Sequence, residues 1–282
     1  MDHRQLPELF PDLFGSLPVR TVRRVQAVVG NARQEGYRPL RWELALLVAV
    51  DRGELDHEEA LAAVKAEFPP PDEASAQFPD WASYLYRGTG VLVNRLGLGD
   101  LAALHAAEAR LTSLRAHEVL IHPAVVDLAG PPSTALRQIH RQLFQDVYDW
   151  AGQDRTVNID RGGSHFAPVR SMVQTADLAA GIAHRPDLPE RSGPGLARDL
   201  GRIYQAVNHS HLFRDGNGRA GKTYLALLAD QAGHDLNFDT VPADAWIRAS
   251  QTSRPVDDLW PEPTDLESLF RNSILVGRDG RR

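Results

Sequence analysis

The sequence predicts an all-α fold with one β-hairpin, because apolar residues recur at helical spacing along most of its 282 residues. The clearest example is the stretch 133–151, whose inward face carries Leu136, Ile139, Leu143, Val147 and Trp150. Residues 156–159 alternate polar and apolar side chains as a strand does, residues 160–163 can turn, and residues 165–168 can return. No alternating series of strands and helices is visible, so a parallel sheet is not expected.

Three short helices are predicted within the first 68 residues. The first, over 18–36, begins at a proline and ends at a glycine, which is the usual order of these residues around a helix. A second follows over 39–52, and a third begins at Asp56, which can form a capping box with Glu59. A unit of roughly 50 residues has little core of its own, so we expect it to dock on the rest of the chain.

A domain boundary is predicted at residues 69–80, where three prolines precede small polar residues, a composition typical of a linker. It separates a front domain, 1–68, from a larger domain, 81–282. The larger domain is expected to contain helices over 101–119, 133–151, 171–184, 196–211, 219–232, 243–250 and 264–274.

Bulk composition narrows the possible roles. A net charge of −6 gives no electrostatic support for direct nucleic-acid binding. The absence of cysteine excludes disulfides and thiolate metal sites and fits a reducing compartment. The N-terminus lacks a basic-then-apolar signal pattern, and the longest apolar run, 44–50, is too short to span a membrane. We therefore expect a cytoplasmic protein without membrane contact.

The stretch 211–223 gathers a histidine, a carboxylate, three glycines and several cations. Its second half, from Gly216 to Thr223, fits the pattern G-x-x-x-x-G-K-[ST] of the phosphate loop in P-loop NTPases. That loop must follow a buried parallel strand, whereas residues 203–211 have a helical pattern. The P-loop interpretation is therefore disfavoured.

A helix–loop–helix site explains more of the same residues. One helix is expected to end near His211, and the next to open at Gly216. The free N–H groups of this opening turn, which includes Asn217 and Gly218, would form an anion hole, and the helix dipole adds to its preference for phosphate.

Charged side chains around this hole suit nucleotide chemistry. The guanidinium of Arg219 can donate two hydrogen bonds to a phosphate, and Lys222 lies three residues later on the same helix face. Asp215 can hold a divalent cation on the same phosphates, and His211 can take a proton from an attacking hydroxyl at neutral pH. Phe213 is expected to point into the core and fix the loop.

Residues 211–219, His-Leu-Phe-Arg-Asp-Gly-Asn-Gly-Arg, resemble the Fic signature H-x-F-x-[DE]-G-N-G-R-x-x-R, and the resemblance extends over about residues 81–276. It implies a helical bundle with a β-hairpin flap. As in most characterised members, it also implies transfer of AMP from ATP to a Ser, Thr or Tyr hydroxyl of a target protein. By position, His211 would be the catalytic base and Asp215 the Mg²⁺ ligand. The phosphate-binding residues would be Gly216, Asn217, Gly218, Arg219 and Lys222.

Lys222 is the one departure from the signature, which ends in Arg. In the family this Arg contacts the γ-phosphate of the nucleotide. Lysine keeps the charge but loses the bidentate fork, so the preferred nucleotide stays open.

The residues Ser164, His165, Phe166 and Ala167 stand where the Fic flap would be. By resemblance, this hairpin would hold a segment of the target protein by main-chain pairing, as strand addition does elsewhere. For toxin-like members, the resemblance suggests subunits of bacterial type II topoisomerases as targets.

The front domain resembles an antitoxin. Residues 31–36 fit the inhibitory motif [ST]-x-x-x-E-[GN] of many Fic proteins, except that Asn31 replaces Ser or Thr. The three short helices resemble the small antitoxins of Fic toxin–antitoxin pairs. In the family the motif's glutamate pairs with the last Arg of the signature and blocks the γ-phosphate site. We therefore expect Glu35 to restrain the activity by reaching Lys222, and tethering would make this inhibition effective without strong affinity.

Two other functions stay open on the sequence alone. Some Fic relatives transfer phosphate or use another nucleotide, although the intact Gly-Asn-Gly-Arg argues against the kinase branch. A non-catalytic Fic-like binding module is the other alternative, and the retained His211 and Asp215 argue against it.

Overall fold

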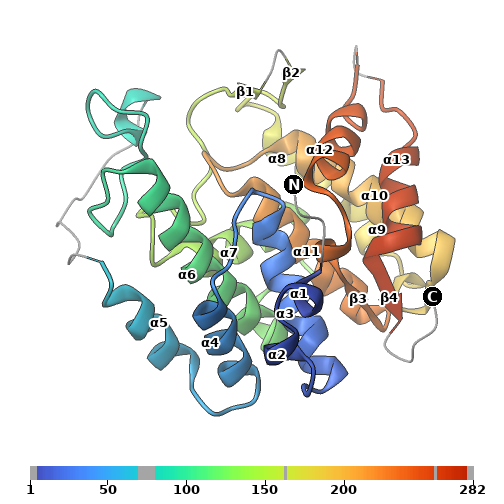
Figure 1. Ribbon diagram of the computed structural model, residues 1–282. Coiled ribbons are helices and arrows are strands. Elements are labelled where there is room, and N and C mark those ends of the chain that lie inside the picture. Colours follow the sequence, from blue (N-terminus) through green and yellow to red (C-terminus); the bar gives the residue numbers. More distant parts are fainter. Residues whose placement is uncertain (1–4, 69–79, 162–163, 257–258, 278–282) are drawn as a thin grey trace.

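Helices make up nearly all regular structure in the computed structural model of this protein, which describes residues 5–68, 80–161, 164–256 and 259–277 (Figure 1). The predicted all-α class is thereby confirmed. The described residues also contain two short antiparallel pairs: β1 (Asp160–Arg161) with β2 (Ser164–His165), and β3 (His234–Leu236) with β4 (Leu275–Gly277). The second pair was not predicted, because its strands lie far apart in the chain. None of the described helices combines the length and the apolar character needed to cross a membrane.

The three helices expected in the front domain are present as α3 (Val19–Arg33), α4 (Arg41–Asp51) and α5 (His57–Lys65). Asp56 caps α5 by accepting a hydrogen bond from the Glu59 N–H at 2.7 Å, as predicted. Two helical turns, α1 (Leu6–Leu9) and α2 (Pro11–Phe14), precede them. They were not predicted, because a four-residue turn is too short to show a helical period.

The rest of the chain packs its helices around α11 (Asn217–Gln231), which contacts α6 (Leu101–Ile121), α7 (Pro132–Phe144) and α10 (Gly193–Ser210). Most residues of α11 are buried, so it is a core helix. The remaining elements are η1 (Ala82–Tyr84), η2 (Pro123–Val125), α8 (Met172–Asp177), α9 (Ala180–Ala183), η3 (Leu188–Glu190), η4 (Phe238–Thr240), α12 (Ala243–Thr252), α13 (Thr264–Leu269) and the π-helical turn η5 (Phe270–Ile274).

One hydrophobic core runs through both parts of the chain. Buried side chains of the front helices, such as Val25, Leu44 and Leu61, belong to the same cluster as those of α6, α7 and α11. The front helices α3 and α5 both contact α6, so this small unit is docked, as expected. The predicted linker 69–80 lies, apart from Asp80, outside the described residues. The division into 1–68 and 81–282 therefore stays a prediction.

The C-terminal half of α3 is fixed against η4. The side-chain amide of Gln34 donates to the carbonyl oxygens of Phe238 at 2.9 Å and Val241 at 2.6 Å. Gly30 allows this close approach, because a Cβ there would lie 2.6 Å from the backbone nitrogen of Asp239. These contacts set the position of the segment that directly follows α3.

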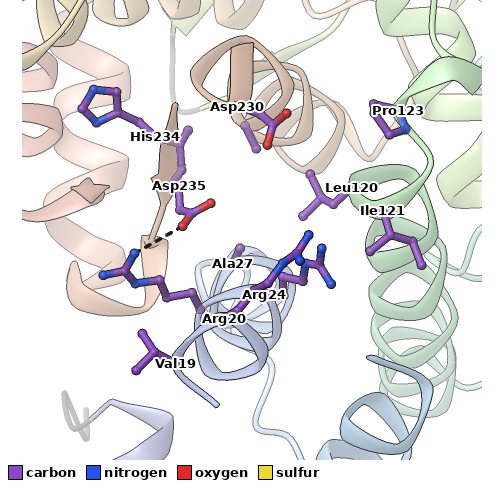
Figure 2. A pocket seen from close by; sticks show the side chains of 13 residues that line it. Val19, Arg20, Arg24, Ala27, Leu120, Ile121, Pro123, Asp230, His234 and Asp235 are labelled. Atoms are coloured by element: carbon purple, nitrogen blue, oxygen red, sulfur yellow. Dashed lines mark ion pairs between the residues drawn. The ribbon is translucent and has the colours of Figure 1, made fainter. Parts of the chain in front are cut away.

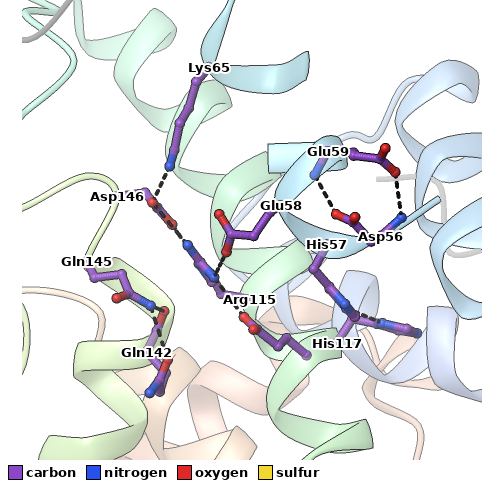
Figure 3. Close-up of polar contacts among 11 residues, drawn as sticks. Asp56, His57, Glu58, Glu59, Lys65, Arg115, His117, Gln142, Gln145 and Asp146 are labelled. Carbon is purple, nitrogen blue, oxygen red and sulfur yellow. Dashed lines mark hydrogen bonds and ion pairs between the residues drawn. The ribbon is translucent and has the colours of Figure 1, made fainter. Parts of the chain in front are cut away.

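Charged and polar side chains join α5 to α6 and to the turn after α7 (Figure 3). Arg115 of α6 donates to Asp146 at 2.7 Å and to Glu58 of α5 at 2.9 Å. Nearby, His57 of α5 shares a hydrogen bond of 3.0 Å with His117 of α6. Breaking one partner of a buried pair such as Arg115 and Asp146 would leave a charge unpaired, so this network specifies how the front helices dock.

The hairpin strands are shorter than predicted and shifted along the chain. The expected strand 156–159 is irregular, and β1 begins at Asp160, where a turn was predicted. Arg155 explains the shift, because its guanidinium donates to the Val157 carbonyl at 2.7 Å and its N–H donates to the Leu212 carbonyl at 2.8 Å. These bonds tie the segment to the loop after α10 instead of to an opposite strand.

Candidate active site

His211 directly follows α10 as its C-cap and has a φ of 44°, the only positive φ of a non-glycine residue in the described part of the chain. This left-handed conformation is uncommon and persists where the surrounding structure imposes it. The Nδ1 atom of the ring lies 3.2 Å from the carbonyl oxygen of Asn208. Because a carbonyl can only accept, this bond assigns the proton to Nδ1 and makes Nε2 the basic nitrogen of the neutral ring.

Neighbouring side chains fix both the ring and the backbone of His211. The Phe166 ring stacks on it with centroids 3.6 Å apart, and the Arg254 guanidinium lies 4.7 Å from the Phe166 centroid. Arg155 donates through Nε to the carbonyl oxygen of His211 at 2.8 Å. The imidazole is therefore held in place before a substrate arrives, which favours catalysis by proximity.

The loop after His211 turns into α11 at Gly216, as predicted. Gly216 has a φ of 75°, and a Cβ there would lie 2.4 Å from the Phe144 ring, so only glycine fits. Asn217 clamps the loop by accepting from the Phe213 N–H at 2.9 Å and donating to the Phe213 carbonyl at 2.7 Å. The first N–H groups of α11, which have no acceptor within the helix, are thereby presented as an anion hole.

A buried histidine of α7 that was not predicted, His140, supports this loop. Its Nδ1 accepts from the Gly152 N–H at 2.8 Å, and its Nε2 donates to the Asp215 carbonyl at 3.1 Å. The ring also stacks on Phe213, with centroids 3.9 Å apart, so Phe213 points into the core as predicted. Burial lowers the pKa of His140 to about 3, which keeps the ring neutral and able to both accept and donate.

Acid should destabilise the protein through His140. The folded protein keeps this ring neutral down to about pH 3, whereas the unfolded chain binds a proton there below about pH 6.5. Between these values the unfolded state holds more protons. Lowering the pH by one unit in this range should therefore reduce the free energy of unfolding by up to about 1.4 kcal/mol. Urea unfolding at about pH 7 and about pH 5.5 measures the fall. The variant His140→Gln lacks this titration and should show a smaller fall. An equal fall in both proteins would contradict the assignment.

Arg219 lies in the first turn of α11, beside the predicted anion hole, and a residue that was not predicted holds it there. Glu108 of α6 forms an ion pair with Arg219 and also accepts a hydrogen bond from the hydroxyl of Tyr148. Although burial opposes the charge, the Glu108 carboxylate raises the pKa of Arg219, so the guanidinium stays positive. No local pattern pointed to Glu108, because it lies 111 residues from Arg219 in the chain.

The carboxylate of Glu35 lies at the N-terminus of α11. Its Oε1 atom is 3.4 Å from the Nζ atom of Lys222, and a Cβ on Gly218 would lie 2.7 Å from the same oxygen. Lys222 also donates to the Asn31 carbonyl at 3.3 Å, and the Asn31 side chain donates to the Arg219 carbonyl at 3.2 Å. The predicted contact between Glu35 and Lys222 is therefore present, and Asn31 takes part in it.

Lys222 is more deeply buried than a phosphate-binding lysine on a helix surface would be, with 1% of its surface exposed. Burial lowers the pKa of Lys222, and the Glu35 carboxylate opposes this effect. A buried ammonium group needs an anion beside it. Glu35 supplies that anion here, and a phosphate group has the charge to supply it in the same place.

The site opens into a cleft of about 310 Å³ lined by residues of α10, α11 and α12, with residues 34–36 of the front domain also in its lining. Asp215 stands in this lining with its side chain exposed, and its Oδ1 accepts from the Gly216 N–H at 2.6 Å. Mg²⁺ commonly takes one or two carboxylates and completes its shell with substrate phosphates and water. A single carboxylate beside an anion hole fits that mode of binding.

The predicted flap is described in part. The backbone of Ser164–His165 forms β2, while the side chains of these two residues lie outside the described structure. At Ala167 the backbone already has partners within the chain, because its N–H donates to the His209 carbonyl at 2.9 Å and its carbonyl accepts from Arg155. The predicted role of residues 164–167 in binding a target stays a prediction.

The sequence profile of the Fic/DOC family matches residues 131–229, which include α7, the hairpin, α10 and the loop that opens α11. A Salmonella typhimurium protein named "Probable protein adenylyltransferase Fic" is 35% identical over 205 residues, which cover 70% of this chain and 94% of the relative. A protein of the same name from Escherichia coli is 35% identical over 68% of this chain and 91% of the relative. "Protein adenylyltransferase VbhT" from Bartonella schoenbuchensis is 30% identical over 69% of this chain but only 37% of its own length.

Solved structures share the fold. The BepC protein of Bartonella tribocorum, with bound AMPPNP, matches 72% of this chain and 100% of its own chain, with a TM-score of 0.56 and 20% identity. The N-terminal Fic domain of a Bartonella quintana effector, with bound ADP, matches 70% of this chain and 96% of its own, with a TM-score of 0.55 and 20% identity. The helical architecture around α11 is thus one that occurs in nucleotide-bound proteins.

Proposed function

Because this chain belongs to the Fic/DOC family and is a protein adenylyltransferase, we propose that it transfers AMP from ATP to a Ser, Thr or Tyr hydroxyl of a target protein and that its own front domain restrains the reaction. One observation carries the proposal: His211, with its basic nitrogen defined, lines the same cleft as the first turn of α11 and Glu35, whose carboxylate pairs with the buried Lys222.

His211 is the proposed base of the transfer. Its Nε2 takes the proton of the target hydroxyl while that oxygen forms a bond to the α-phosphorus of ATP. The bond between the α-phosphorus and the oxygen that bridges to the β-phosphorus breaks, and pyrophosphate leaves with the electron pair. The hydrogen bond from Nδ1 to Asn208 at 3.2 Å supports this role, because it keeps the second nitrogen basic.

The phosphates of ATP are proposed to lie on the first turn of α11. The N–H groups of Asn217 and Gly218 would donate to them, and Arg219 would add a charged hydrogen bond. Glu108 supports this by holding the guanidinium in a fixed orientation. Mg²⁺ on Asp215 would supply charge neutralisation to the phosphates and to the leaving pyrophosphate.

Inhibition is proposed to follow from the position of Glu35. Its carboxylate lies against Gly218 and beside Lys222, so it stands where a terminal phosphate would make the same contacts. Gln34 and Gly30 fix α3 against η4, which makes the block part of the docked fold. Residues 1–68 would thus act as an antitoxin-like domain within the same chain.

The target is proposed to bind along the flap, with its main chain paired to residues 164–166. Such pairing selects an exposed extended segment more than a particular side chain. Subunits of type II topoisomerases are the first targets to examine.

Mass spectrometry can test the chemistry. The variant Glu35→Gly, incubated with ATP and Mg²⁺ in a cell lysate, should place AMP on a hydroxyl side chain of a discrete set of proteins, because the block is removed and His211 is intact. The matched control is the double variant Glu35→Gly with His211→Asn. A phosphate adduct in place of AMP would favour the phosphotransferase alternative, and identical spectra for the two variants would refute both transferase functions.

A further inference from the structure

A second pocket, of about 580 Å³, lies between the front domain and the larger domain, and its lining shares no residue with that of the candidate active site (Figure 2). One wall is the first half of α3, with Arg20, Arg23 and Arg24. The opposite wall comes from the end of α11 and from β3, and the end of α6 closes a third side. A pocket of this volume suits a small organic ligand.

The α3 wall is strongly cationic in an unusual place. Three arginines occupy the first two turns of the helix, and its first turn has no acidic residue, although the positive end of the helix dipole favours acidic residues there. Arg24 pairs with Asp51 at 3.0 Å, and Arg23 lies 3.6 Å from Asp235. Arg20, one turn before Arg24, is exposed to the pocket and the solvent and forms no hydrogen bond or ion pair with the described residues, although its charge acts on Asp235. An anion in the pocket would relieve this concentration of charge.

The opposite wall carries two carboxylates. Asp230 and Asp235 line it (Figure 2), and they would repel a ligand that is anionic at both ends. Between the walls the lining is apolar, with Ala27 and Leu236 among its residues.

We propose that this pocket binds a small organic phosphate that has an apolar body and a hydrogen-bond donor at its other end. The phosphate would meet Arg20 and Arg24, since guanidinium groups match phosphate geometry. The body would lie on the apolar lining, and the donor would face Asp230. The ligand is an effector, because it touches α3, whose far end leads directly to Glu35, and the larger domain at the same time.

Such a ligand clamps α3 in its docked position. A pocket with walls from both domains exists only while they are docked, so binding stabilises that state by mass action. Resting on the proposed role of Glu35, this clamp lowers the rate of AMP transfer. In Glu35→Gly the same ligand binds without lowering the rate.

The test uses 4-aminophenyl phosphate as the probe on the full chain, with inorganic phosphate and phenyl phosphate as comparison compounds. Calorimetric titration should show the probe binding more tightly than either comparison compound. Binding should persist in Glu35→Gly when AMPPNP saturates the active-site cleft. The variant Arg20→Gln, which loses one charged contact, should bind about tenfold more weakly. Its control is Arg52→Gln, which removes an exposed charge elsewhere on the front domain and should bind like wild type.

Each outcome decides a separate point. Equal affinity in Arg20→Gln, equal affinity for the three compounds, or displacement by AMPPNP would overturn the site. If binding depends on Arg20 but the probe lowers the rate of Glu35→Gly as much as that of wild type, the clamp is overturned. If Glu35→Gly is itself no faster than wild type, the proposed inhibition fails and the binding result stands.

Discussion

Replacing Glu35 with glutamine should raise the rate of AMP transfer by about 30-fold, through the loss of about 2 kcal/mol from the inhibited state. The estimate follows from the geometry of one contact. Glu35 faces the Lys222 ammonium at 3.4 Å, with 0% of the lysine side chain and 45% of the glutamate side chain exposed. A hydrogen bond between charged groups contributes about 1.5–3 kcal/mol, and the exposure of Glu35 places this one below the top of that range because water screens it.

Glutamine keeps the size of the side chain, so the variant separates charge from bulk. ATP should also bind more tightly, because the proposed competition between its phosphate and the Glu35 carboxylate for Lys222 and for the helix N-terminus is removed. The KM for ATP should therefore fall while kcat rises. The rate is measured as incorporation of labelled AMP into the target or into the protein itself.

The matched control for this variant is Glu54→Gln. Glu54 belongs to the same domain, is 52% exposed and pairs with Arg52 at 2.9 Å, so the control changes the net charge equally without touching the cleft. It should leave both kinetic constants unchanged. An equal rise in the two variants, or no rise in Glu35→Gln, would show that Glu35 is not a brake.

The features that the sequence predicts well are local ones. The loop from His211 to Lys222 carries its whole pattern within twelve residues, and glycine at position 216 is required by a positive φ and by the nearby Phe144 ring. The capping box at Asp56 is local in the same way. The contact between Glu35 and Lys222 spans 187 residues, and it was predicted only because the inhibitory motif of the family resemblance joins the two positions.

The residues that escaped prediction act over long distances in the chain. His140 reaches the Asp215 carbonyl across 75 residues, and Arg155 reaches the His211 carbonyl across 56. Glu108 reaches Arg219 across 111. A buried histidine, arginine or glutamate gives no local signal that identifies its partner, since the partner is set by packing. The shift of the hairpin has the same cause, because Arg155 binds a distant loop instead of leaving residues 156–159 to pair.

Replacing His211 with asparagine should lower kcat by roughly 10²–10⁴, the usual contribution of a general base, with little change in the thermal stability of the protein. Asparagine is the right substitution because position 211 has a φ of 44°. Asn occupies the left-handed region more readily than other residues with a side chain. Alanine there would add backbone strain to the loss of the base and would confuse the two effects.

The measurement belongs in the Glu35→Gly background, where the proposed block is absent. Single-turnover transfer of labelled AMP isolates the chemical step, and the melting temperature reports whether the loop stays folded. ATP affinity should be nearly unchanged, because the anion hole is formed by the N–H groups of α11 and not by the imidazole. A variant that keeps more than about a hundredth of the rate would fall outside the range expected for loss of a general base. In that case the stack of His211 against Phe166 would be its main contribution, and the proton of the target hydroxyl would have to leave by another route.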